Sequence, residues 1–190
     1  MQAEHAKRYG EGPQPKAALM HASRRNLGYT LIETMLAIAI VGILSAMALP
    51  SFAKMIQRQQ TQSTRDGIFS LVQNARTIAL ARQQHVVLCG SSDGVRCSSA
   101  RQWSQQLLSF VDVNQNRQPD ANDTMLVILQ LEPQVNVNAS RPLLVYRHDG
   151  SARGTNLTIK VCNNQQRTAQ GASVVVANSG RARMDVAECR

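Results

Sequence analysis

The sequence predicts an α+β protein in which one long N-terminal helix packs on an antiparallel β-sheet domain. Residues 29–52 form an apolar stretch, and residues 53–83 repeat apolar side chains at spacings of three and four, so both segments favour a helix. From residue 84 onward, at least five short apolar runs are separated by Pro, Gly, Asn and Asp, which is typical of strands. One helix followed by many strands favours an antiparallel sheet over alternating βα units.

The apolar stretch from Tyr29 to Phe52 is long enough to cross a membrane. As a helix its 24 residues would be roughly 36 Å long, against the ~30 Å hydrocarbon core of a bilayer. Arg24 and Arg25 precede it, and the positive-inside bias therefore places the N-terminus in the cytoplasm and everything after Phe52 outside it. We expect the first half of the helix to be transmembrane.

Three residues distinguish this stretch from an ordinary membrane anchor. Glu33 places a carboxylate inside the apolar end, where charge is costly and usually functional. Gly28 lies immediately before the stretch, and Pro50 lies near its end, where a proline would kink or break the helix. The alternative is a plain signal anchor that carries a stray glutamate.

Together these residues resemble the N-terminus of type IV pilins and pseudopilins. In that family a prepilin peptidase cuts after a glycine, the new N-terminal residue is methylated, and a glutamate occupies mature position five. The resemblance implies cleavage after Gly28, methylation of Tyr29, and filament assembly through Glu33 and Pro50. Tyr29 replaces the usual phenylalanine but keeps the aromatic ring. Between bundled helices, the buried carboxylate of Glu33 needs a cation, which a neighbour's N-terminal amine can supply.

The resemblance also divides the chain and locates it. Residues 1–28 are expected to be a leader that is removed, although Met20 is an alternative start. Residues 29–52 are the transmembrane and assembly helix, residues 53–83 its amphipathic continuation, and residues 84–190 the antiparallel β domain with a basic C-terminal tail. We expect a single-pass inner-membrane protein with a periplasmic C-terminal domain, which becomes extracellular in the pilus. Its expected partners are the prepilin peptidase, the inner membrane before assembly, and other pilins.

The amphipathic segment and the β domain have recognisable patterns. We expect the apolar face of the helix to lie on the sheet and Gln and Arg side chains to cover its other face. The apolar face comprises Ile56, Ile68, Leu71, Val72, Ala75, Ile78 and Ala79. The predicted strands are residues 85–89, 102–113, 125–131, 135–139, 143–147, 157–162 and 173–178.

Four cysteines follow the apolar stretch, and an even number in an oxidising compartment indicates two disulfides. Sequence allows three pairings. We favour Cys89 with Cys97, which closes a short loop, and Cys162 with Cys189, which ties the tail to a strand. No CxxC pair or Cys/His cluster has zinc spacing, so no metal site is expected.

The loop at residues 112–123 resembles a calcium loop, because Asp112, Asn114, Asn116 and Asp123 fall at loop positions one, three, five and twelve. Position six, where a sharp turn needs glycine, is Arg117, and position twelve is aspartate instead of glutamate. We therefore interpret the segment as an Asx-rich turn. His85 precedes a strand, and His148 lies beside Asp149 in a turn with no evident nucleophile. We expect no catalysis and no cofactor.

Charge favours an anionic partner. The formal charge of the chain is +9, and removing the leader, with its five bases and two acids, leaves +6. Arginine supplies 14 of the 16 remaining bases, and an Arg-rich outer domain favours nucleic acid or an anionic surface. The chain has only seven aromatic residues, so base stacking on an aromatic platform is not expected.

The basic residues concentrate at the C-terminus. Residues 141–190 hold eight bases and three acids. Arg181 and Arg183 flank Ala182, and in an extended segment residues two apart point to the same side. Gly180 before them can relax the backbone into a turn. Two guanidiniums on one side can each engage the oxygens of a phosphate.

The mature chain resembles the FimT/GspH branch of minor pilins in its helix, its 112–123 region, the segment RHDGSARGTNLTIKVC at residues 147–162, and a last strand followed by GRAR. In FimT members linked to natural transformation, a GRxR motif in the C-terminal tail binds DNA. The resemblance implies that Gly180, Arg181 and Arg183 form this motif, and we add Arg190 and Lys160 as weaker contacts.

Two functions are therefore expected from the sequence. The first is a minor pilin that binds double-stranded DNA non-specifically, through its phosphates, for uptake in natural transformation. The alternative is a structural minor pilin or pseudopilin that primes pilus assembly, or acts in a type II secretion system as GspH does. The alternative needs Glu33 but not the basic tail.

Overall fold

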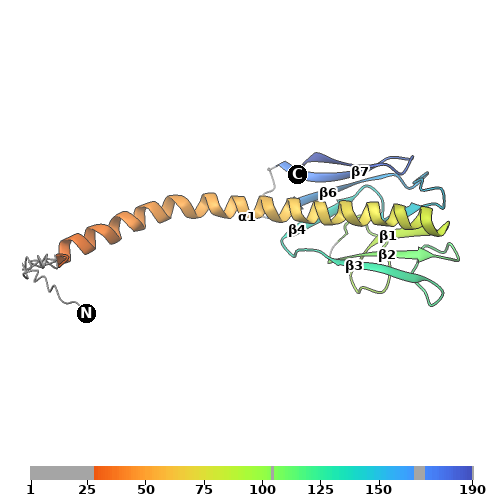
Figure 1. Cartoon of the computed structure of the whole chain (residues 1–190), viewed down its shortest axis with the longest axis horizontal. Helices are drawn as coiled ribbons and strands as arrows, with labels where there is room; N and C mark the ends of the chain where they lie inside the picture. The colour runs from red at the N-terminus through yellow and green to blue at the C-terminus, as the bar shows by residue number, and fades with distance from the viewer. Residues whose placement is uncertain (1–27, 104, 165–169, 190) are drawn as a thin grey trace, which may run out of the picture. The chain divides into compact units, whose positions relative to one another are not determined.

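The computed structural model describes residues 28–103, 105–164 and 170–189 (Figure 1). The chain divides into two compact units, Met1–Leu44 and Ser45–Arg190. Helix α1 (Leu31–Arg82) passes from the first unit into the second. Within the described residues, α1 is long and apolar enough to cross a membrane. The α+β architecture predicted from the sequence is therefore the architecture of the protein.

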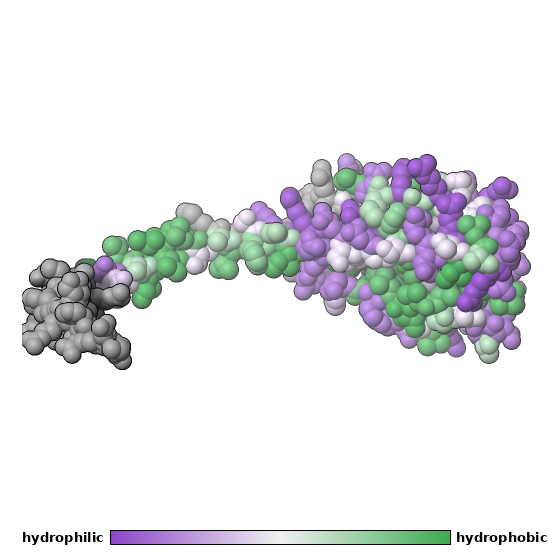
Figure 2. Space-filling view, in the orientation of Figure 1, coloured by the Kyte–Doolittle hydropathy of each residue, from purple (hydrophilic) through white to green (hydrophobic). Residues whose placement is uncertain are grey.

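The first turn of α1 is fixed by local hydrogen bonds. The side-chain hydroxyl of Thr30 accepts a hydrogen bond from the backbone N–H of Glu33 at 3.3 Å, and the Thr30 carbonyl accepts from Glu33 and Thr34. A threonine cap followed three residues later by glutamate is the sequence of a capping box. The helix therefore begins directly after this cap, at Leu31. Figure 2 shows apolar side chains over the part of α1 in the first unit.

Of the two effects expected of Pro50, a kink or a break, the break does not occur, because α1 continues through this residue to Arg82. Proline removes one N–H donor from the helix interior and crowds the carbonyl four residues earlier. The neighbours on both sides, such as Ala46, Leu49 and Ala53, are helix formers, and the remaining hydrogen bonds hold the chain in one helix.

The second unit contains two four-stranded antiparallel sheets where the sequence led us to expect one. Sheet 1 has the order β3-β2-β1-β5, and sheet 2 has the order β4-β6-β7-β8. Strand pairing between distant segments sets this division, and no local pattern encodes it. The strands are β1 (His85–Ser91), β2 (Gln106–Asp112), β3 (Thr124–Gln130), β4 (Val135–Ala139), β5 (Leu143–Tyr146), β6 (Leu157–Asn163), β7 (Gln170–Val176) and β8 (Ala182–Glu188).

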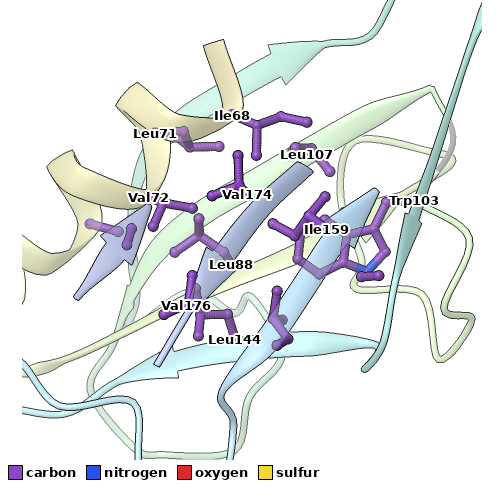
Figure 3. Close-up of a cluster of buried hydrophobic side chains, with 14 of the residues drawn as sticks. Ile68, Leu71, Val72, Leu88, Trp103, Leu107, Leu144, Ile159, Val174 and Val176 are labelled. Carbon is purple, nitrogen blue, oxygen red and sulfur yellow. The ribbon is translucent and has the colours of Figure 1, made fainter. Parts of the chain in front are cut away.

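One core joins the C-terminal half of α1 to both sheets (Figure 3). Ile68, Leu71 and Val72 of the helix face buried residues such as Leu88 of sheet 1 and Val174 of sheet 2. All five side chains are at most 5% exposed. Burying an aliphatic side chain of this size stabilises the fold by ~1.5–3 kcal/mol, so this core holds both sheets and the helix as one unit.

The strand predicted at residues 102–113 begins later, at Gln106. Trp103 belongs to the other sheet, since its backbone N–H donates to the Val137 carbonyl at 2.8 Å and its indole N–H to the Pro142 carbonyl at 3.1 Å. Gln105 has a φ of 69°, which turns the chain out of one sheet and into the other. The single tryptophan is thereby fully buried.

Candidate nucleic-acid interface

The C-terminal segment predicted as a tail is an edge strand of sheet 2. Strand β8 pairs with β7 along its whole length, from Ala182 opposite Val176 to Glu188 opposite Gln170. A tight turn joins the two strands, in which the Gly180 N–H donates to the Ala177 carbonyl at 2.9 Å. The basic residues near the C-terminus are therefore held in a defined register.

Gly180 is buried in this turn, and its backbone makes the turn possible. Its φ of 78° lies in the left-handed region that favours glycine. A β-carbon at Gly180 would collide with the carbonyl oxygen of Gly150, which belongs to the neighbouring 147–151 turn. Gly180 thus lets two turns pack backbone against backbone. In this geometry it positions the residues after it and offers no surface of its own.

Two further residues hold these turns together. The buried Tyr146 hydroxyl donates to the Gly180 carbonyl at 3.2 Å, and burial raises the pKa of this phenol, which keeps it a neutral donor. Arg76 of α1 donates from Nε to the Gly150 carbonyl at 3.1 Å and from a terminal nitrogen to the Ser179 carbonyl at 3.4 Å. The turn before Arg181 is therefore fixed to the helix.

Arg181 and Arg183 are both exposed, while Ala182 between them is buried. This alternation agrees with the two-residue spacing and directs both arginines away from the core. Nε of Arg183 lies 3.7 Å from Oδ2 of Asp185, and both of these side chains are more than half exposed. An exposed pair of this kind is worth only ~0.2–1 kcal/mol, so Arg183 stays available to another anion.

Lys160 lies on the same face of sheet 2 as Arg183 and Asp185. The register places Lys160 opposite Ser173 and Ser173 opposite Asp185, and residues directly opposite share a face. The structure thus brings Lys160 to the face that carries the two arginines, with its side chain exposed. Arg190 lies outside the described residues.

The disulfides join the pairs expected from the sequence, Cys89 with Cys97 and Cys162 with Cys189. The second bridge connects β6 with the residue that follows β8 and passes over β7 at Gly171. A β-carbon at Gly171 would meet the Sγ atoms of both Cys162 and Cys189. This bridge anchors the free end of the edge strand.

In the loop between β2 and β3, backbone N–H groups of the loop itself donate hydrogen bonds to its aspartates. Asp112 accepts the N–H groups of Asn116 and Arg117 at 3.1 and 3.0 Å, and Asp123 accepts the Val113 N–H at 2.9 Å. Among the described residues, no group of three or more His, Cys, Asp or Glu is arranged to hold a metal ion. These contacts agree with an Asx-rich turn.

The residues expected to act at the N-terminus lie in or near α1. Tyr29 and Glu33 are exposed, and Gly28 has open space around it. Sequence reasoning missed the cap at Thr30, although the spacing of Thr30 and Glu33 is a recognisable signal. It also missed Arg76 and Tyr146, whose roles depend on contacts with residues more than 30 positions away.

Two family models match the chain. A model described as the prokaryotic N-terminal methylation motif matches residues 23–49, which include Gly28, Tyr29 and Glu33. Together with the fold, this motif defines a type IV pilin-like protein of the minor pilin and pseudopilin class. The model described as Type II transport protein GspH matches residues 65–180, more than half of the chain. The protein therefore belongs to the GspH family.

Known proteins agree with this assignment. The type IV major pilin protein PilA of Myxococcus xanthus is 43% identical over 47 residues, which cover 25% of this chain and about a fifth (21%) of the length of PilA. Two crystal structures of the minor pilin FimU of Pseudomonas aeruginosa match with TM-scores of 0.53 and 0.56 at 16% identity. They cover 68% and 72% of this chain and 99% of FimU, and at this identity they show the shared fold.

The class has known general properties. Pilin-like families are structural and non-enzymatic, and a methylation motif is typical of proteins that a prepilin peptidase processes and that assemble with other pilins. The apolar N-terminal helix fits membrane anchoring before that assembly. The GspH match ends at Gly180, so Arg181 and Arg183 lie beyond it.

Proposed function

We propose that this minor pilin binds double-stranded DNA through two exposed arginines, Arg181 directly before β8 and Arg183 within it, for uptake in natural transformation. The observation that carries the proposal is the outward direction of Arg181 and Arg183 at the edge of sheet 2. In the described part of the chain, the Arg181 side chain makes no hydrogen bond or ion pair. Arg183 has only the weak exposed partner Asp185.

These arginines suit phosphates better than bases. Two residues apart in an extended segment, their attachment points are separated by ~6.6 Å, so each guanidinium can engage a different phosphate. The fixed turn before Arg181 and the disulfide at Cys189 reduce the ordering cost of binding. Recognition through phosphates is tolerant of sequence, and the affinity of one subunit should lie in the ~10⁻⁴–10⁻⁶ M range of non-specific binding. Several subunits in one filament raise the avidity.

A salt titration tests the proposal. The mature chain is purified in a nonionic detergent, and its binding to a fluorescently labelled duplex is followed by anisotropy at several salt concentrations. The double variant Arg181→Gln with Arg183→Gln should bind more weakly, and each lost phosphate contact should reduce the slope of log K against log salt by about 0.9. Arg96→Gln with Arg117→Gln is the matched control, because these arginines are exposed on loops of sheet 1. Equal binding by the β8 variant and the parent refutes the assignment.

The N-terminal residues complete the proposal. The prepilin peptidase cuts after Gly28, Tyr29 is methylated, and residues 1–28 are lost. The basic residues before the helix keep the N-terminus in the cytoplasm, so residues beyond the membrane span face the periplasm and later the outside of the pilus. Glu33 then pairs with the N-terminal amine of a neighbouring subunit, and Pro50 belongs to the assembly segment.

The family match also favours a second, structural function. In this role the protein is a minor pilin that primes pilus assembly or a pseudopilin in type II secretion. This function uses the same helix and Glu33, and it does not require Arg181 and Arg183. Deletion of the gene distinguishes the two. Loss of pili or of protein secretion favours the structural role, whereas normal pili without DNA uptake favour the DNA-binding role.

A further inference from the structure

The outer face of sheet 2 continues past Arg183 into a groove. Thr158 lies opposite Val175, and Val175 lies opposite Arg183, so these three residues form one row across β6, β7 and β8. Their neighbours Ile159 and Val174 are buried in the core, which places the row on the other face. Thr158 and Val175 line a groove of about 510 Å³ that begins directly beside β8.

Two other arginines line the side of this groove that lies away from β8, which we call the far bank. Arg101 comes from the segment before Trp103, and Arg141 comes from the connection between β4 and β5. Both are exposed, and the described lining of the groove contains no carboxylate. Its floor of threonine and valine is neutral. The surface therefore has positive charge on two sides and nothing that repels an anion between them.

The far bank is held in place by hydrogen bonds. Nε of Arg141 donates to the Asn156 carbonyl at 3.0 Å, which fixes the guanidinium and leaves its terminal nitrogens to bind a ligand. Ser140 donates its N–H to the Thr158 carbonyl at 2.9 Å, and its hydroxyl accepts from the Thr158 N–H at 3.1 Å. The backbone of Arg101 is fixed as well, because its carbonyl accepts the Ala139 N–H at 2.8 Å.

The spacing of the two banks suits a duplex. Neighbouring strands lie ~4.8 Å apart, so β8 and β6 are separated by roughly 10 Å, and Arg141 lies beside β6. Arg183 and Arg141 are therefore too far apart to share one phosphate, and each must contact a different one. A rigid surface with two such rows of guanidiniums matches a polyanion with regularly spaced charges better than it matches a single small anion.

We propose that Arg101 and Arg141 are the second half of the DNA site, and that duplex DNA lies across the groove with phosphates on both banks. This inference rests on the proposed function of β8. It adds two contact residues that lie 40 or more positions before Arg181 in the sequence. It also predicts a footprint of several phosphates for one subunit, where Arg181 and Arg183 alone would give about two.

The test compares salt slopes for matched double variants of the mature chain in nonionic detergent, with a labelled duplex as the probe. Arg101→Gln with Arg141→Gln should reduce the slope of log K against log salt by up to about 1.8 relative to the parent, at about 0.9 for each phosphate contact. The control Arg96→Gln with Arg117→Gln removes the same charge from other loops and should leave the slope within error of the parent. Combining the groove and β8 variants should lower the slope by the sum of the two effects.

The outcomes separate this inference from the proposed function. If the β8 variant binds weakly and the groove variant binds as the parent does, the groove inference fails and the β8 assignment stands. If the groove variant alone binds weakly, the β8 assignment fails, and with it the inference that the groove is the second half of one site. An equal loss in the control variant shows a general charge effect and overturns the inference. Arg101→Gln alone, with a slope lower by about 0.9, supports the inference even if replacing the anchored Arg141 weakens the fold.

Discussion

The α-carbon of Gly180 packs so closely on the carbonyl oxygen of Gly150 that no side chain fits between them. This contact joins the turn between β7 and β8 to the turn after β5, and Tyr146 and Arg76 add hydrogen bonds on either side of it. In this segment Gly180 is therefore the residue that sets the backbone, and Arg181 and Arg183 are the residues that face outward. Substitution of the glycine should act on the fold first.

We expect Gly180→Ala to destabilise the domain by about 3 kcal/mol or more, because a left-handed backbone costs ~1–3 kcal/mol for a non-glycine residue and the collision adds to it. Gly154→Ala is the matched control, since Gly154 has a φ of 79° but open space around it. It should cost only the backbone strain, ~1 kcal/mol. Denaturant unfolding followed by the fluorescence of the buried Trp103 measures both. Equal losses would show that the contact with Gly150 carries no energy.

Period-two and period-three-to-four patterns predicted most of the fold. Strand β4 was predicted with the same bounds as observed, because Val135, Val137 and Ala139 alternate with polar residues. Strand β8 was missed because an edge strand buries little. Met184 and Val186 are exposed, and their charged neighbours give no apolar alternation.

In the candidate site, too, some features follow from local sequence patterns and others depend on the folded chain. The shared direction of Arg181 and Arg183 follows from two-residue spacing, and the structure agrees with it. The position of Arg141 beside Thr158 depends on how β4, β6 and β7 pair, which only the folded chain determines. Local patterns thus predict which way a side chain points, but they do not predict which distant side chains share its surface.

Removing the disulfide between Cys162 and Cys189 should release β8. The bridge spans 27 residues, and the loop-entropy model assigns it about 3.5 kcal/mol, against about 2.5 kcal/mol for the eight-residue span from Cys89 to Cys97. We expect Cys162→Ser with Cys189→Ser to lower stability and to make the bond after Arg183 sensitive to trypsin. Cys89→Ser with Cys97→Ser should leave that bond protected. Equal cleavage rates in both variants would contradict an anchoring role for the second bridge.

Asp93 should make stability depend on pH in the acid range. Hydrogen bonds from the backbone N–H groups of Arg96 and Val95, and from the Ser91 hydroxyl, lower the pKa of Asp93 from 3.8 to about 2. A folded pKa below the unfolded one means that the charged form stabilises the fold above pH ~4 and that this stabilisation is lost as pH falls towards 2. Asp93→Asn keeps an oxygen acceptor without the charge. As pH falls from 4 to 2, the free energy of unfolding of Asp93→Asn should rise relative to that of the parent. Parallel curves of unfolding free energy against pH over that range would exclude the effect.

Glu33 occupies the third position of a capping-box sequence and is also the charged group proposed for assembly. Its backbone N–H donates to the Thr30 hydroxyl, a bond that does not depend on the Glu33 side chain, and glutamine suits the third position of a capping box as well as glutamate does. We therefore expect Glu33→Gln to keep the helix and the cleavage after Gly28, yet to be excluded from filaments as completely as Glu33→Ala. Thr30→Ala is the control that weakens the cap and keeps the carboxylate. Cleavage is read from the mass of the mature chain, and incorporation from its presence in sheared pili or pseudopili. If Glu33→Gln enters filaments normally, its charge is not what assembly requires, and the pairing with a neighbour's N-terminal amine is wrong.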